Sequence, residues 1–181
     1  TGDIHTANQL AAGLETRDQA KTFIYAFLYG AGDAKIGSIT GGTARDGKRL
    51  KEKFLANTPA LGRLRERVGV ASGRGYVLGL DRRRVAIRSS HAALNSLLQS
   101  AGAIIMKKAL CLLDEYATIW GLDYHIIGNI HDEIQTEVRA DNAERFGQLA
   151  TSCVEAAGLF YKLNCPLAGD YKVGNTWADT H

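Results

Sequence analysis

The chain has 181 residues, of which 45% are hydrophobic and 23% are charged, so it can bury one sizeable core or two small ones. Its formal net charge of +3 is too small to indicate a nucleic-acid partner by itself. Three cysteines, at positions 111, 153 and 165, lack metal-binding spacing and indicate reduced thiols in a cytosolic setting. No leader-like start and no apolar run near ~18 residues is found, so we expect neither a signal peptide nor a membrane span.

The distribution of charge is more informative than its total. From Arg17 to Arg88 there are 16 Lys and Arg residues against 6 Asp and Glu. From Ser89 to His181 there are 6 against 11. This asymmetry indicates a region that holds a polyanion beside a carboxylate site that recruits cations, with chance asymmetry as the alternative.

A short helix is predicted over residues 4–12, ending at Gly13, and a second one follows it. Thr16 can cap the second helix, Gln19 can complete a capping box, and Gly30 suits a left-handed stop. Inside this helix four apolar residues fall on one face at helical spacing, which predicts that they face the core: Ala20, Phe23, Ile24 and Phe27.

A second stripe of the same helix carries Arg17, Lys21, Tyr25 and Tyr29, each four residues from the next. From Arg17 to Tyr25 it is about 12 Å long at ~1.5 Å per residue. Two cations followed by flat rings suit a ligand with phosphates at one end and a stacked base at the other, such as a nucleoside triphosphate. The alternative is a basic face that only keeps the helix solvated.

Further helices are predicted over residues 33–39, 44–56 and 58–68, the last with Pro59 in its first turn. Their many basic residues either contact template phosphates or form a solvated surface. Alternating residues predict a β-hairpin over 76–80 and 84–88 that turns near Asp81 and Arg82. A long helix over 91–119 carries Asn95 and Gln99 four apart on one face.

The acidic half contains a predicted strand, turn and strand from Tyr124 to Val138, with His131, Asp132 and Glu133 at the turn. The first strand is almost entirely apolar, so we expect it to be buried. Adjacent carboxylates on a buried hairpin are costly unless a divalent cation compensates them, although the turn could simply expose Asp132. A helix over 141–157 is predicted to start at Asp141 and to place Cys153 in the core.

Several of these segments together resemble family A (polymerase I-like) DNA polymerases, closest to the phage replicative type, over essentially the whole chain. The matching segments are Gly2-Asp3-Ile4-His5-Thr6, Arg17-x3-Lys21-x3-Tyr25-x3-Tyr29-Gly30, Arg88-x2-His91-x3-Asn95-x3-Gln99, Ile130-His131-Asp132-Glu133-Ile134, and a tail with Gly174-x2-Trp177 and a terminal His181. One departure is Arg82, which stands in the hairpin turn where the family usually has glycine.

The resemblance implies a role for each matching residue. His5, Arg17 and Lys21 would hold the triphosphate of the incoming nucleotide, with Lys21 also catalytic, and Tyr25 would contact its sugar and base. A Tyr at that place implies weak rejection of dideoxynucleotides. Asp132 would ligate two Mg²⁺ ions with Glu133 assisting. Template and primer contacts are expected from Tyr29, Gly30, Arg88, Asn95, Gln99 and His131.

The fold implied is α+β, with helical fingers over residues 13–72 after a lead-in at 1–12, and an incomplete palm with a small antiparallel sheet over 73–181. The family's first metal-binding aspartate, in a motif Asp-x-Ser-x-x-Glu-Leu-Arg, is expected upstream of Gly2 and is missing here. We therefore expect the chain to be inactive alone and to need a complementary N-terminal polymerase fragment, with primer-template DNA and deoxynucleoside triphosphates as its other partners, and no membrane.

Two alternatives remain at this stage. A non-catalytic nucleic-acid-binding remnant would keep the basic face without the chemistry. A single-subunit RNA polymerase would share the Arg, Lys, Tyr-Gly helix and the His-Asp motif, but the Gly-Asp-Ile-His-Thr segment and the helix with Gln99 fit DNA enzymes better. For a phage-encoded enzyme the expected location is the bacterial host cytosol.

Overall fold

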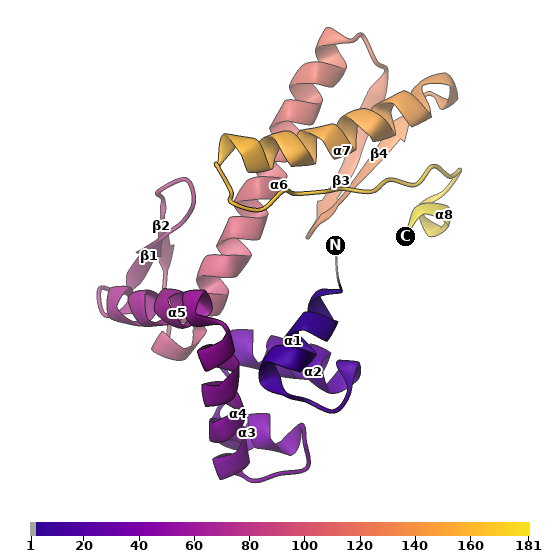
Figure 1. Ribbon diagram of the computed structural model, residues 1–181. Helices are drawn as coiled ribbons and strands as arrows, with labels where there is room; N and C mark the ends of the chain where they lie inside the picture. Colours follow the sequence, from indigo (N-terminus) through magenta and orange to yellow (C-terminus); the bar gives the residue numbers. More distant parts are fainter. Residues whose placement is uncertain (1–2) are drawn as a thin grey trace. The chain divides into compact units, whose positions relative to one another are not determined.

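The structure is a computed structural model that describes residues 3–181 (Figure 1). The chain divides into two compact units, Thr1–Leu98 and Gln99–His181, and the long helix α6 (Ala93–Ile119) runs through the division. In the described residues the strands form two separate two-stranded antiparallel sheets among many helices. The expected α+β class is confirmed, while the assignment of fingers to 13–72 and palm to 73–181 stays a prediction.

The first unit begins with α1 (Ile4–Ala12) and α2 (Arg17–Leu28), whose ends follow the sequence signals. Thr16 and Gln19 form the predicted capping box at the start of α2, and Gly13 and Gly30 take the left-handed φ values of +67° and +79°. Next come α3 (Asp33–Ser38), α4 (Ala44–Asn57) and α5 (Pro59–Ser72). The last of these extends four residues beyond the predicted end at 68.

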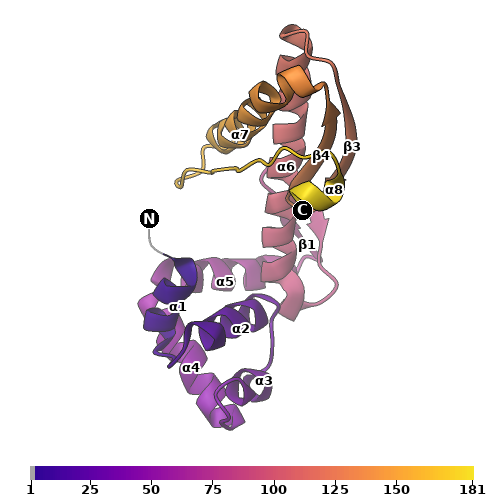
Figure 2. The same cartoon turned by 90° about the vertical axis from the view of Figure 1, so that its right-hand side faces the viewer.

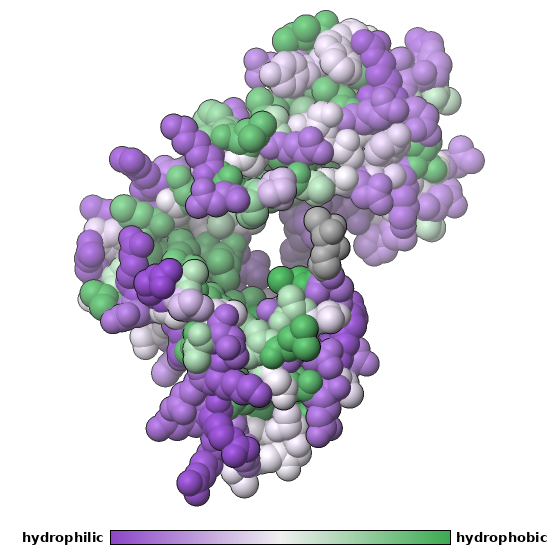
Figure 3. All heavy atoms as spheres, in the orientation of Figure 1, coloured by the Kyte–Doolittle hydropathy of each residue, from purple (hydrophilic) through white to green (hydrophobic). Residues whose placement is uncertain are grey.

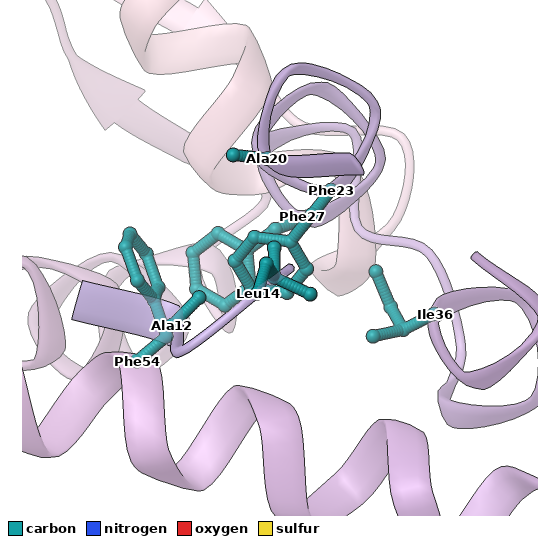
Figure 4. Close-up of a cluster of buried hydrophobic side chains, with 7 residues drawn as sticks. All are labelled: Ala12, Leu14, Ala20, Phe23, Phe27, Ile36 and Phe54. Carbon is teal, nitrogen blue, oxygen red and sulfur yellow. The ribbon is translucent and has the colours of Figure 1, made fainter. Parts of the chain in front are cut away.

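Three aromatic rings form the centre of the first unit's core (Figure 4). Phe23 and Phe27 come from α2, and Phe54 comes from α4. The ring of Phe54 lies edge-on to both, with centroid distances of 5.1 Å to Phe23 and 5.4 Å to Phe27. This packing fixes the buried face of α2 and leaves its opposite face in solvent.

A hairpin of β1 (Tyr76–Leu78) and β2 (Arg84–Ala86) follows α5, with Val77 paired to Val85. The predicted turn is confirmed. Arg82 has φ +63°, the left-handed region that glycine adopts most easily, so the loop keeps the geometry of a glycine turn with an arginine in it. A short 3-10 turn, η1 (Ser90–Ala92), then leads into α6.

The second unit packs the C-terminal part of α6 against α7 (Ala143–Phe160) and one face of a second hairpin (Figure 2). That hairpin consists of β3 (Tyr124–Ile130) and β4 (Glu133–Val138). Leu113 and Ala117 of α6 are buried with Phe146 and Cys153 of α7, so the predicted core position of Cys153 is confirmed. The chain ends in a single turn, α8 (Trp177–Thr180).

The predicted burial of β3 is wrong for this chain. Ile126, Ile127 and Ile130 are 36%, 64% and 40% exposed. The reason is that only β4 pairs with β3 among the described residues, and a bulge between Ile126 and Gly128 interrupts that pairing. An apolar strand is therefore left with solvent on one edge and with exposed side chains along most of its length.

The start of α7 also differs from the prediction. A 3-10 turn, η2 (Ala140–Asn142), precedes the helix, and Asn142 is its N-cap residue without a side-chain hydrogen bond. Asp141 does not cap the helix: it lies within η2, one residue before the N-cap position, and its carboxylate pairs with the guanidinium of Arg139 at 2.7 Å.

The segment Ser90–Ile119 is long and apolar enough to pass for a membrane-spanning helix by length and composition. This differs from the sequence analysis, which found no apolar run of that length. Core helices of other proteins meet the same test. Lys107 and Lys108 lie in the middle of this segment, and Leu113 and Ala117 are buried in the core of the second unit. Of the 18-residue window that meets the test, 17% is buried in this structure.

Candidate nucleotide and metal sites

The predicted nucleotide stripe lies on the exposed face of α2, opposite the aromatic core. Arg17 and Lys21 are exposed, and the rings of Tyr25 and Tyr29 are 50% and 60% exposed. Exposed aromatic rings of this size in a row with cations offer both stacking and charge to a ligand. The structure thus presents the side chains as expected, while their contact with a nucleotide stays a prediction.

Helix α1 brings His5 to this stripe. The ring centroids of His5 and Tyr25 are 6.2 Å apart. The Nδ1 atom of His5 is buried and has no hydrogen-bond partner among the described residues. A buried polar atom without a partner is costly, so a ligand group that bonds to this ring would gain by satisfying it.

An ion pair that sequence reasoning missed anchors the first end of the stripe. Asp3 caps α1 by accepting hydrogen bonds from the backbone N–H groups of His5 and Thr6. Its two carboxylate oxygens also accept from Nε and a terminal nitrogen of Arg17, at 2.6 and 3.2 Å. An aspartate before a helix signals a cap, but no local pattern links it to an arginine 14 residues away.

The pKa of Asp3 is held far below its ordinary value, chiefly by the Arg17 side chain and then by the Thr6 hydroxyl. Because the folded-state pKa is lowered, this carboxylate stabilises the fold above its unfolded pKa, and the contribution is lost as pH falls through the lowered value. We expect Arg17→Met to raise the pKa of Asp3 more than Thr6→Val does. Carboxyl-carbon NMR titration measures both shifts, and equal shifts would contradict the order of causes.

The far end of the stripe packs against η1, the turn before α6. A Cβ built on Gly30 would lie 2.3 Å from the carbonyl oxygen of His91, so only glycine permits this approach. Gly30 thus lies against a residue that stands between Arg88 and Asn95 in the sequence. Asn95 is half-buried, and the exposed Gln99 follows one turn later on α6.

The predicted metal-binding turn joins β3 to β4. Ile130 pairs with Glu133, so His131 and Asp132 form a two-residue loop, and both side chains are exposed. His131 has φ +56°, a conformation that costs a non-glycine residue energy in such a turn. The loop therefore presents the Asp132 carboxylate to solvent at the tip of the hairpin.

Glu133 is held by contacts that the sequence did not indicate. Its carboxylate accepts hydrogen bonds from the Gln135 amide and the Trp177 indole, and it lies 3.1 Å from Nδ1 of His181. Gln135 is the largest cause of a lowered Glu133 pKa, followed by His181. Trp177 and His181 are 44 and 48 residues from Glu133 along the chain, so no periodicity could signal this contact.

The donor set at the loop fits part of a magnesium site. Mg²⁺ in proteins takes one or two carboxylates, with water and substrate phosphates as its remaining ligands. Asp132 would supply one such carboxylate, and Glu133 follows it directly. Among residues 3–181 no cluster of three or more His, Cys, Asp or Glu side chains could hold an ion, so a two-ion site would need further carboxylates from elsewhere.

Comparison with known proteins places the chain in a class. The family model "DNA polymerase family A" matches residues 2–179. The chain belongs to this family, which agrees with the resemblance of its motifs.

Within the family, the chain is similar to phage enzymes. It is 42% identical to the DNA-directed DNA polymerase of Escherichia phage Phieco32 over 99% of this chain and 30% of that protein. It is 44% identical to that of Escherichia phage T7, over 99% of this chain and 29% of the relative. DNA polymerase I of Pseudomonas aeruginosa is 26% identical over 92% of this chain and 19% of its own length. The chain thus spans about 30% of the length of its phage relatives.

A solved structure has a similar fold. The POL domain of Pol1 from M. smegmatis, in a complex with a DNA primer-template and dNTP, matches with a TM-score of 0.77 at 22% identity. The match covers 86% of this chain and 31% of that one. At this identity the likeness concerns the fold alone.

Proposed function

We propose that the chain is the C-terminal part of a DNA-directed DNA polymerase that adds deoxynucleotides to a primer 3′ end by a two-metal mechanism. The observation that carries the proposal is the exposed face of α2, where Arg17, Lys21 and Tyr25 follow one another and His5 lies beside the last of them. Membership of family A supports the polymerase class, and the printed names of the phage relatives support DNA as template and product.

The nucleotide would lie along α2. Arg17, Lys21 and His5 bind the triphosphate, and positioned cations stabilise the charge that develops on its phosphates during transfer. Lys21, one helical turn after Arg17, has the further role of a catalytic cation, which the resemblance to family A implies for the Lys of this motif. Tyr25 contacts the sugar and base.

The hairpin loop would hold the metal. Asp132 ligates Mg²⁺, and Glu133 assists beside it. The chemistry that such ions would supply is activation of the primer 3′-hydroxyl and stabilisation of the leaving pyrophosphate. The role of this chain's own residues is to keep a carboxylate exposed at the tip of a rigid hairpin.

Template and primer would meet the chain at both units. Tyr29 and Gly30 lie by the template base, and Arg88 contacts the DNA backbone. Asn95 and Gln99 read the acceptors common to all base pairs, since an amide both donates and accepts. His131 lies close to the primer end. Hydrophilic side chains gather over α4, where basic residues suit the phosphates of the template (Figure 3).

We propose that a complementary N-terminal polymerase fragment supplies the first metal-binding aspartate and the remainder of the palm. Two observations support this partner. The chain spans about 30% of the length of its phage relatives. Ile126, Ile127 and Ile130 of β3 are exposed on a strand with an unpaired edge, and such an edge readily pairs with another strand. The assembled enzyme would act in the host cytosol.

The experiment that tests the proposal is reconstitution. The chain alone is expected to give no primer extension with Mg²⁺ and deoxynucleoside triphosphates, and the chain mixed with residues from the N-terminal part of a phage relative is expected to extend the primer. The N-terminal part alone is the control. Robust extension by the chain alone would refute the need for a partner, and no extension by the mixture would refute the polymerase assignment.

Tyr25→Phe in the assembled enzyme should increase discrimination against dideoxynucleotides. A dideoxynucleotide lacks the 3′-hydroxyl, and the phenol hydroxyl of Tyr25 can take its place as a donor to the phosphates. The lost charge-assisted bond predicts about 10- to 100-fold lower relative incorporation. Competition between deoxy and dideoxy substrates measures this ratio, with Tyr29→Phe as the matched control that should leave it unchanged.

A further inference from the structure

The last residues of the chain form a rigid turn. Asp179 accepts hydrogen bonds at one carboxylate oxygen from the backbone N–H groups of Asn175 and Thr176, at 3.1 and 2.9 Å, and from the Thr176 hydroxyl at 2.9 Å. This reciprocal cap starts α8 at Trp177. The turn therefore presents its side chains in a fixed direction.

Those side chains converge on the carboxylate of Glu133. The indole Nε1–H of Trp177 donates to Oε1 at 3.1 Å, and Nδ1 of His181 lies 3.1 Å from Oε2. Gln135 donates to the same Oε1, and its own amide oxygen accepts from the Thr180 hydroxyl at 3.3 Å. Both carboxylate oxygens of Glu133 therefore have polar partners. Apart from Gln135, which lies on the same strand, these partners come from the C-terminal turn.

We propose that Trp177 is a positioning residue for Glu133, through which the end of the chain fixes the direction of the carboxylate beside the metal-binding loop. This inference rests on the proposed function of Glu133 and adds a residue to which that function assigns no role. Indole nitrogen only donates, so its contact requires an acceptor with negative charge or a lone pair. A carboxylate held by several donors keeps one rotamer.

The surroundings of Trp177 favour this role over simple packing. Its side chain is 51% exposed, so burial does not account for where the ring lies. The ring of His181 stands edge-on to it at 6.3 Å, and the Glu133 carboxylate is the polar partner of both rings. The hydrogen bond that orients the half-exposed Trp177 ring therefore also orients the Glu133 carboxylate.

The contact itself is tested on the isolated chain by NMR. The sequence has 2 tryptophans, so the indole N–H region shows two signals and Trp120 acts as an internal control. Glu133→Ala should shift the Trp177 signal and accelerate its hydrogen exchange, whereas Glu137→Ala on the same strand should change neither signal. Glu133→Gln provides a second variant that keeps the shape of the side chain. An unchanged Trp177 signal in both Glu133 variants would overturn the inference.

The role is tested in the assembled polymerase by a double-mutant cycle. Trp177→Phe should lower kcat about tenfold and raise the Mg²⁺ concentration for half-maximal extension, with the nucleotide KM and DNA affinity within about twofold. In a Glu133→Gln background the same substitution should have no further effect, because Trp177 acts through Glu133. Trp120→Phe is the control expected to leave kcat unchanged.

The outcomes distinguish a failure of the positioning role of Trp177 from a failure of the proposed polymerase function. Additive effects of Trp177→Phe and Glu133→Gln, or a Trp177→Phe enzyme with wild-type kcat and Mg²⁺ dependence, would overturn the positioning role and leave the polymerase assignment standing. A wild-type assembly without extension would refute the proposed function and with it the catalytic purpose of the contact, even if the Trp177 indole signal still responded to Glu133.

Discussion

Asp132→Asn in the assembled polymerase is expected to reduce primer extension by at least about 10³-fold, because the substitution removes the exposed carboxylate that we propose as the metal ligand. The change is almost isosteric. Asp132 is exposed in a two-residue loop, so the register of β3 and β4 should be unaffected. DNA affinity should stay within about twofold, since the basic residues that we propose bind the DNA phosphates are untouched.

The measurement is single-turnover extension of a labelled primer, paired with DNA binding by fluorescence anisotropy. Asp123→Asn is the matched control, because Asp123 is also exposed and stands just before β3. It should leave both readouts unchanged. Extension retained by Asp132→Asn would favour the alternative of a nucleic-acid-binding remnant, for which the loop carboxylate has no chemical task.

The helices of the first unit could be predicted closely because their ends are encoded by neighbouring residues. Thr16 and Gln19 satisfy each other's backbone groups within one turn, and Gly30 takes the φ of +79° that ends the helix. Asp141 shows the limit of such signals. It is a good capping residue by type, yet its carboxylate pairs with Arg139, and only coordinates reveal which of two local partners wins.

The candidate sites also differ in how far apart their residues lie along the chain. The stripe on α2 and the loop with Asp132 each lie within a short stretch of sequence, so spacing and the family resemblance were enough to predict them. The pairing of Asp3 with Arg17 and the cradle that Trp177 gives Glu133 join residues far apart along the chain. Contacts of this kind depend on packing, for which a single sequence carries no periodic signal.

The mistaken burial of β3 has a different origin. An apolar strand predicts that its side chains are covered, but the pattern does not say which polypeptide covers them. Ile127 is 64% exposed here. The proposed complementary fragment offers one source of such cover, with a strand to pair at the free edge of β3 and further side chains to pack on its faces.

Phe54→Ala is expected to destabilise the first unit by about 3–5 kcal/mol, the usual cost of truncating a buried aromatic ring. Phe54 is 1% exposed and lies edge-on to both Phe23 and Phe27. Removing its ring leaves a cavity between α4 and α2 and takes away both aromatic contacts. The helix that carries Arg17 and Lys21 would then lose the support that holds its exposed face in place.

Hydrogen–deuterium exchange followed by mass spectrometry is the suitable measurement, because both tryptophans lie in the second unit and their fluorescence would not report on the first. Peptides from α2 and α4 should exchange faster in Phe54→Ala, while those from α7 should not change. Phe160→Ala is the matched control, since that ring is 60% exposed and its loss should cost less than about 1 kcal/mol. Equal protection of α2 in Phe54→Ala and wild type would show that this helix keeps its place without the aromatic core, and the support assigned here to the nucleotide stripe would then be wrong.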